Sequence, residues 1–255
     1  MNRLEEILQV KRAEVEQLRP NAAQLQQQAR APRDFRGFRA AVDRDDGQLA
    51  IIAEIKKASP SAGLIASHFD PLERAKTYEQ QGAEAISVLT DQTFFQGGLD
   101  DLTAVRATVS LPILRKDFIV DEIQILEAAA AGADAVLLIV AALSQDQLLH
   151  LSEFAAEYHL DALIEIHSAD ELDRALDVGA QIVGINNRDL TTFQIDLSTT
   201  EKLSELVPHH VVLVSESGFK TVDHVARAHR CGVDAILVGE ALMRGVISIE
   251  QLREL

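Results

Sequence analysis

The chain has 255 residues, of which 47% are hydrophobic, and it carries a formal net charge of −16 at pH 7. This length suits a single α/β barrel. The acidic charge repels phosphate-rich partners, so we expect no binding to nucleic acid or to an anionic membrane surface. An anionic substrate would need a local group of cations that works against this overall charge.

The cysteine content indicates a reducing compartment. Cys231 is the single cysteine, so an intrachain disulfide is excluded and a cytoplasmic location is expected. Residues 1–20 contain no long apolar segment of the signal-peptide kind. No apolar run approaches the roughly 18 residues of a membrane helix. No cluster of Cys and His has zinc spacing, so we expect no metal site.

Residues 1–48 are predicted to form a helical extension. An apolar stripe at helical spacing marks the first helix: Leu4, Ile7, Leu8, Val15 and Leu18. Lys11 interrupts this stripe, and Pro20 ends the helix. Residues 21–31 are rich in Gln and Ala and predict a second helix before Pro32.

From residue 49 onward, short apolar runs alternate with stretches that are mostly long enough for one helix. The runs cover residues 49–55, 85–89, 112–114, 135–140, 162–166, 182–185, 211–214 and 235–238. This alternation predicts βαβ units and a parallel sheet. Every second run is preceded by Gly, a small residue and a polar residue, starting at Gly82, Gly132, Gly179 and Gly232. The repeat predicts a single (β/α)8 TIM barrel over residues 49–255. An open doubly wound sheet is the alternative, but eight similar units favour closure.

The first and third strands of such a barrel end in charged residues. Catalytic groups of these barrels lie at the C-terminal ends of the strands, and alternate residues face inward. Glu54 and Lys56 share a face at the end of the first strand. Only one of Arg115 and Lys116 can face inward from the third strand, and the alternation that includes Phe118 selects Lys116.

The later strands bring further polar residues to the same end. Glu165 and His167 share a face of the fifth strand, Asn186 and Arg188 share a face of the sixth, and Glu216 ends the seventh. A buried Glu165 would be costly unless it is paired or functional. His167 either faces the site or caps the next helix. Together these strand ends predict an active site.

Glycines in the last two strand–helix loops predict a phosphate site. Ser217 and Gly218 follow the seventh strand, and Gly239 follows the eighth. In many barrels these two loops bind phosphate through backbone N–H groups, and glycine lets the backbone approach the anion closely.

Five segments at these strand ends resemble the motifs of the indole-3-glycerol-phosphate synthase family. The segments are residues 54–61 (EIKKASPS), 112–120 (PILRKDFIV), 163–167 (LIEIH), 184–190 (GINNRDL) and 215–218 (SESG). The likeness spans nearly the whole chain, including the helical extension. The motifs are specific in combination, because other phosphate-binding barrels share the glycine-rich loops without the strand-end charges.

The resemblance implies a carboxy-lyase of tryptophan biosynthesis. Its substrate would be 1-(2-carboxyphenylamino)-1-deoxyribulose 5-phosphate, a carboxylated aromatic ring joined through nitrogen to a sugar phosphate. The implied reaction closes the indole ring with loss of carbon dioxide and water. The resemblance implies no metal and no organic cofactor. We expect the protein to act as a monomer or a homodimer.

The family's catalytic roles carry over to five residues of this chain. Lys116 would be the general acid at the substrate carbonyl, and Glu165 would be the general base. Glu54 and Lys56 would assist dehydration, with Lys56 also near the carboxylate. Asn186 would orient the intermediate.

The resemblance also assigns binding roles to ten residues. Arg188 and Glu216 would hold polar groups of the substrate. The aromatic ring would pack against Phe95, Phe118, Leu137 and Leu190. The phosphate would be received by Ser59, Ser217, Gly218 and Gly239.

Two features depart from the family pattern. Ala62 and Ala66 stand in the loop after the first strand, where many relatives have basic residues, which lowers the expected grip on anions. Glu240 stands where relatives often have a small hydroxyl residue, and it should weaken phosphate binding unless it points away. The loop after the first strand, residues 57–68, is predicted to close over the substrate, with Gly63 as a hinge.

Other functions remain compatible with the pattern of strand ends. A phosphosugar isomerase or a Schiff-base aldolase could use the same barrel, and the aldolase would use Lys116 as a nucleophile. An inactive barrel that serves as an assembly subunit is the third alternative.

Overall fold

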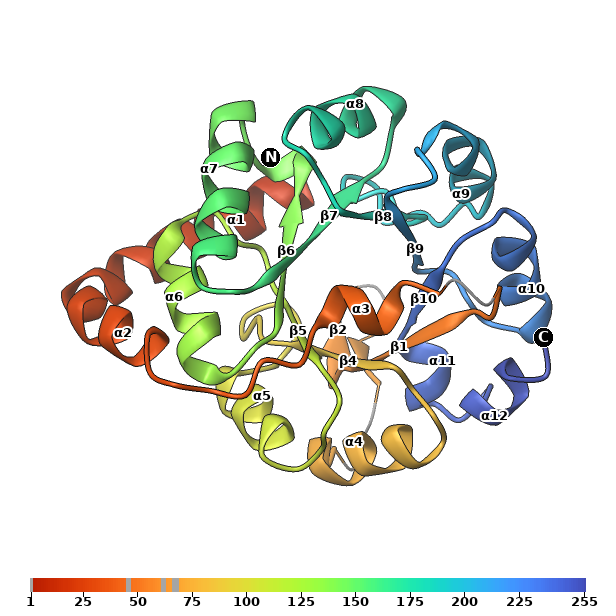
Figure 1. Cartoon of the computed structure of the whole chain (residues 1–255), viewed down its shortest axis with the longest axis horizontal. Helices are drawn as coiled ribbons and strands as arrows, with labels where there is room; N and C mark the ends of the chain where they lie inside the picture. The colour runs from red at the N-terminus through yellow and green to blue at the C-terminus, as the bar shows by residue number, and fades with distance from the viewer. Residues whose placement is uncertain (1, 45–46, 61–62, 66–68) are drawn as a thin grey trace.

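Eight parallel strands form a closed barrel in the computed structural model, which describes residues 2–44, 47–60, 63–65 and 69–255 (Figure 1). The strands are β1 (Ala50–Ile55), β4 (Ala85–Leu89), β5 (Ile113–Lys116), β6 (Ala135–Ile139), β7 (Asp161–Ile166), β8 (Ile182–Asn186), β9 (Val212–Glu216) and β10 (Ala235–Val238). β1 pairs with both β4 and β10, which closes the sheet. The predicted barrel is confirmed, and the open sheet is excluded.

Helices surround the barrel and cover its outer surface (Figure 1). They are α4 (Pro71–Gln80), α5 (Leu99–Arg106), α6 (Glu122–Ala131), α7 (Gln145–Glu157), α8 (Ala169–Asp177), α9 (Ser198–Leu203), α10 (Val222–Arg230), α11 (Glu240–Met243) and α12 (Ile249–Leu252). Several begin at a side chain that accepts a hydrogen bond from the first turn: Asp70, Asp121, Ser144, Ser168 and Thr221. Not one helix of the described ranges has both the length and the apolar character needed to cross a membrane.

The repeated glycines have the conformation that the sequence pattern predicts. Gly82, Gly132, Gly179 and Gly232 all have a φ between 74° and 91°. A residue with a side chain adopts this left-handed region at a cost, whereas glycine does not. Each of these glycines therefore ends a helix and turns the chain toward the next strand.

The N-terminal extension reaches both ends of the barrel. It consists of α1 (Arg3–Leu18), a short 3-10 turn, α2 (Ala22–Ala29) and α3 (Phe38–Val42). α1 lies at the C-terminal end of the strands, where the buried residues Ile7 and Leu8 join the apolar cluster of the barrel interior. α2 packs along α6 on the outside.

α3 closes the opposite end, where the strands begin. Phe38 and Val42 are fully buried in the interior cluster of the barrel. The backbone N–H of Arg39 donates to Asp161 Oδ2 at 2.8 Å, at the start of β7. Because α3 covers this end, the C-terminal end of the strands is where the barrel can receive a ligand.

Candidate active site

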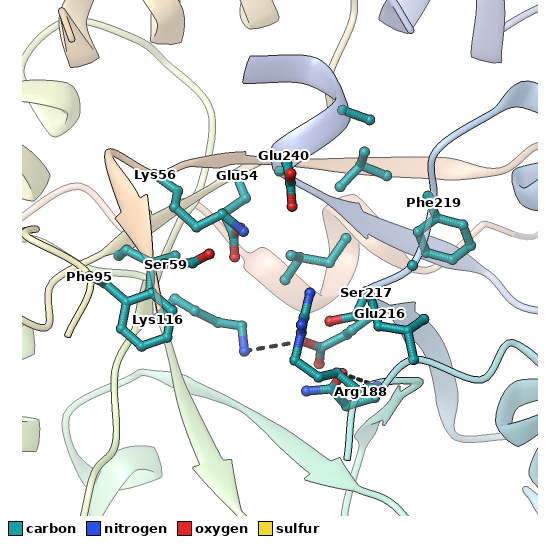
Figure 2. Close-up of a pocket in the computed structure, with 18 of the residues that line it drawn as sticks. Glu54, Lys56, Ser59, Phe95, Lys116, Arg188, Glu216, Ser217, Phe219 and Glu240 are labelled. Carbon is teal, nitrogen blue, oxygen red and sulfur yellow. Dashed lines mark hydrogen bonds and ion pairs between the residues drawn. The ribbon is translucent and has the colours of Figure 1, made fainter. Parts of the chain in front are cut away.

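A cavity of about 300 Å³ lies at the C-terminal end of the barrel (Figure 2). All fifteen residues that the sequence assigns to the site line it: Glu54, Lys56, Ser59, Phe95, Lys116, Phe118, Leu137, Glu165, Asn186, Arg188, Leu190, Glu216, Ser217, Gly218 and Gly239. They come from all eight strands or from the loops that follow them, so the barrel brings together residues that are far apart along the chain.

Lys116 lies between two buried carboxylates. Its Nζ is 2.9 Å from Glu165 Oε2 and 3.2 Å from Glu216 Oε2. Figure 2 shows Lys116 and Glu216 projecting toward one another across the cavity. The side chains of Glu165 and Glu216 are each 1% exposed, so water screens these charges little. The alternation along the third strand selected Lys116 over Arg115, and Lys116 lines the cavity, whereas the guanidinium of Arg115 donates to the backbone oxygen of Gln124 at 2.7 Å.

The surroundings separate the protonation states of these three groups. Burial works to lower the pKa of Lys116, but the carboxylates of Glu165 and Glu216 outweigh it and raise that pKa. Burial works to raise the pKa of Glu165, but the positive charge of Lys116 outweighs it and holds that pKa below its usual range. Burial raises the pKa of Glu216, and Lys116 does not offset this effect. The site therefore contains an acid and a base in contact.

Two glycines make room for carboxylates of the site. A Cβ atom at Gly239 would collide with the carboxylate of Glu54, and one at Gly184 would collide with the carboxylate of Glu216. Glu54 is buried and forms an ion pair with Lys56, the next inward-facing residue of the same strand end. The sequence identified Gly239 as a phosphate ligand and gave no role to Gly184.

Asn186 and Arg188 extend the polar side of the cavity at the end of β8. The Oδ1 of Asn186 accepts a hydrogen bond of 3.0 Å from the backbone N–H of Arg188. The guanidinium of Arg188 donates to the backbone oxygen of Phe193 at 3.2 Å and lies 5.9 Å from the centre of that ring. These contacts hold the Arg188 side chain over the cavity.

The apolar side of the cavity contains the rings of Phe95 and Phe118, whose centres are 6.2 Å apart. Leu137 and Leu190 complete this side. Asp91 Oδ1 accepts backbone hydrogen bonds from Phe94 at 2.6 Å and from Phe95 at 3.1 Å. This contact fixes the loop that carries Phe95.

Lys11 of α1 forms ion pairs with Asp91 and Asp117, beside the loops that carry Phe95 and Phe118. The sequence did not predict these ion pairs. Lys11 is 1% exposed, and its Nζ lies 2.8 Å from Asp91 Oδ2 and 2.9 Å from Asp117 Oδ1. Asp117 follows Lys116 directly, and its Oδ1 also accepts the backbone N–H of Phe118 at 2.8 Å. The signal was present in the sequence as the charged interruption of the apolar stripe of the first helix.

The loop after β9 begins with two residues in the left-handed region of the backbone. Ser217 and Gly218 have consecutive positive φ angles of 68° and 90°, and both residues line the cavity. The cavity lining there includes two cations that the sequence reasoning missed, Lys220 and Arg244. Lys220 stands two residues after Gly218, and its position in this loop could have identified it.

The two departures from the family pattern have different outcomes. Glu240 lines the cavity, and its Oε1 accepts a hydrogen bond from Arg244 Nε at 3.0 Å. Ala62 and Ala66 lie outside the described residues. In the same loop after β1, two short strands pair antiparallel, β2 (Ala58–Ser59) with β3 (Gly63–Leu64).

Comparison with known proteins agrees with this geometry. A family model described as indole-3-glycerol phosphate synthase matches residues 4–255. An indole-3-glycerol phosphate synthase of Roseiflexus sp. (strain RS-1) is 50% identical over an alignment that covers 99% of this chain and 97% of that protein. One of Chlorobium phaeovibrioides (strain DSM 265 / 1930) is 48% identical, with 95% of each chain covered. Because the family model matches almost the whole chain and these relatives are about half identical over their full length, the chain belongs to the indole-3-glycerol phosphate synthase family, whose members are carboxy-lyases of tryptophan biosynthesis.

Proposed function

We propose that the cavity closes the indole ring of 1-(2-carboxyphenylamino)-1-deoxyribulose 5-phosphate, with Lys116 as general acid and Glu165 as general base. The observation that carries this assignment is the buried contact of 2.9 Å between these two side chains at the floor of the cavity. The reaction needs a proton at the substrate carbonyl oxygen as the ring carbon attacks. It also needs a base when water is lost. Formation of a fluorescent indole product from this substrate tests the proposal.

Lys116 is suited to the first step because its neighbours keep it protonated. As the carbon–carbon bond forms, the carbonyl oxygen gains negative charge and takes a proton from the ammonium group. The carboxylate of the substrate then leaves as carbon dioxide, and its bonding electrons restore the aromatic ring. Glu165 has the lowered pKa of a carboxylate that remains ionised, so it can accept the proton released during dehydration.

The remaining polar residues surround the leaving hydroxyl and the intermediate. We assign Glu54 and Lys56 to the dehydration step, because they form a charged pair on one strand end that faces the cavity. Asn186 and Arg188 would orient the intermediate from β8. Glu216 has a raised pKa and can hold a proton, so it would donate a hydrogen bond to a substrate oxygen.

The substrate would lie between the apolar side of the cavity and the loops after β9 and β10, which carry Gly218 and Gly239. Phe95, Phe118, Leu137 and Leu190 would pack against the aromatic ring. The phosphate would lie at Ser59, Ser217, Gly218 and Gly239, within reach of Lys220 and Arg244. These cations supply the local positive charge that an anionic substrate needs in a chain of net charge −16.

Sodium borohydride should trap no covalent adduct when it is added to the protein together with its substrate. A Schiff base forms from a neutral amine, and the raised pKa of Lys116 keeps this amine protonated. Mass spectrometry of the intact protein, with a known Schiff-base aldolase as positive control, makes the measurement. An increase in mass located at Lys116 would favour the aldolase alternative.

Glu240→Gln should strengthen inhibition by inorganic phosphate by roughly three- to tenfold at low ionic strength, because it removes a negative charge from the proposed phosphate side of the cavity. The inhibition constant against substrate, measured at two salt concentrations, provides the test. Glu250→Gln, on α12 outside the cavity lining, serves as the matched control. Equal inhibition of Glu240→Gln and the parent would place the phosphate elsewhere.

We also propose that the protein works in the cytoplasm as a monomer or a homodimer. The single cysteine supports the reducing location. The fifteen assigned residues line one cavity of a single chain, which is compatible with either state.

A further inference from the structure

His167 stands next to the proposed catalytic pair but has no role in the mechanism above. It follows β7 and is not part of the described lining of the cavity. The N-cap position of α8 is taken by Ser168, whose hydroxyl accepts the backbone N–H of Glu171 at 3.3 Å. His167 is therefore not the helix cap that the sequence left open, and its ring makes other contacts.

The imidazole of His167 lies between two carboxylates. Its Nδ1 is 3.2 Å from Glu171 Oε2, and its Nε2 is 3.5 Å from Glu165 Oε1. The backbone N–H of His167 donates to the same Glu171 oxygen at 2.7 Å, which holds that carboxylate beside the ring. A neutral imidazole carries a proton on only one nitrogen and would turn a lone pair toward one of the carboxylates. The protonated ring suits both.

The two atoms that face each other between Glu165 and His167 are both buried. Glu165 Oε1 and His167 Nε2 make no hydrogen bond within the described part of the chain. The other oxygen of Glu165 is occupied by Lys116. A buried carboxylate oxygen is costly without a compensating group, and the positive ring supplies one.

The charges around the ring favour its protonated form. The acidic groups that face it are Glu165 on its own strand, Glu171 on α8 and Glu216 on β9. Burial works to lower the pKa of His167, but the hydrogen bond to Glu171 and the negative charges of Glu165 and Glu171 outweigh it and raise that pKa.

We propose that protonated His167 is a positioning residue for Glu165, which it holds ionised and oriented through Oε1. This inference rests on the proposed role of Glu165 as general base. His167 acts through Glu165 and is not assigned to the substrate. We therefore expect its replacement to lower kcat and to leave KM nearly unchanged.

The pH dependence of kcat separates this role from a merely structural one. His167→Gln keeps an N–H donor and removes the charge, whereas His167→Arg keeps a charge at every pH and can bridge two carboxylates. Glu165 is ionised above its lowered pKa, and loss of the neighbouring positive charge raises that pKa. The acidic limb of kcat should therefore move upward by roughly one to three pH units in His167→Gln. It should return toward the parent position in His167→Arg.

Three controls complete this experiment. His150→Gln removes a surface histidine that contacts Glu122 at 3.0 Å and should leave the profile unchanged. Glu171→Gln removes one carboxylate that keeps His167 protonated and should shift the acidic limb in the same direction as His167→Gln, which tests the contact even if His167→Gln does not fold. Thermal melting of each variant reports folding.

The outcomes distinguish this inference from the proposed function. An unshifted acidic limb in both His167→Gln and Glu171→Gln, or equal shifts in the Gln and Arg variants of His167, would overturn the role of His167. No turnover by the parent, or full turnover by Glu165→Gln, would instead contradict the proposed function.

Discussion

Lys116→Ala is expected to lower kcat by about 10²- to 10⁴-fold, the usual contribution of a positioned general acid. The ammonium group lies in the cavity between Glu165 and Glu216, and its neighbours keep it protonated. Alanine leaves no proton donor of comparable position at the carbonyl. Steady-state kinetics with the fluorescent indole product provide the measurement.

Lys76→Ala is the matched control for this loss, because Lys76 lies exposed on α4, outside the cavity lining. Its kcat should equal that of the parent. Circular dichroism and thermal melting should show that both variants are folded. A kcat of Lys116→Ala within a factor of about three of the parent, far below the effect of a general acid, would remove Lys116 from the mechanism.

Lys11→Met is expected to lower the free energy of unfolding by about 3–5 kcal/mol, the cost of removing one partner from a buried ion pair. Methionine keeps the length and apolar character of the lysine side chain but leaves Asp91 and Asp117 without its charge. The pKa of Asp117 is about 2 in the intact protein, because Arg115 and Lys11 outweigh the effect of burial. Urea unfolding at neutral pH gives the free energy.

The double variant Lys11→Met with Asp91→Asn tests whether the loss comes from an unpaired buried charge. It should lose less stability than the sum of the two single variants, because the pair is removed together. Arg19→Met, which removes an exposed ion pair of the same N-terminal segment, should change little. Additive losses would show that Lys11 does not stabilise the protein through Asp91.

The barrel was predictable because its signals are local. Each strand is a short apolar run, and the alternate strands follow a glycine whose left-handed backbone ends a helix. Inward and outward faces of a strand follow from alternation alone. For this reason the sequence placed Lys116, Glu165 and Asn186 at one end of the barrel, and all three line the cavity.

The contacts between distant segments were not predictable in the same way. Lys11 is charged at a position where the helical stripe requires an apolar residue, and its partners Asp91 and Asp117 belong to the ends of other elements. Pairing of this kind depends on how α1 lies on the barrel, which no local pattern specifies. The protonation states of Glu165 and Glu216 likewise depend on which carboxylate lies closer to Lys116.

The most direct test of the proposed function is a comparison of two products from the same substrate. The protein would be incubated with 1-(2-carboxyphenylamino)-1-deoxyribulose 5-phosphate labelled with ¹³C in its carboxyl group. Labelled carbon dioxide and the indole fluorescence would then be measured over time. Both products should appear at the same rate and in equal amounts, and Lys116→Ala should slow both together. Substrate consumed without release of labelled carbon dioxide, or carbon dioxide released without indole, would contradict the proposed function.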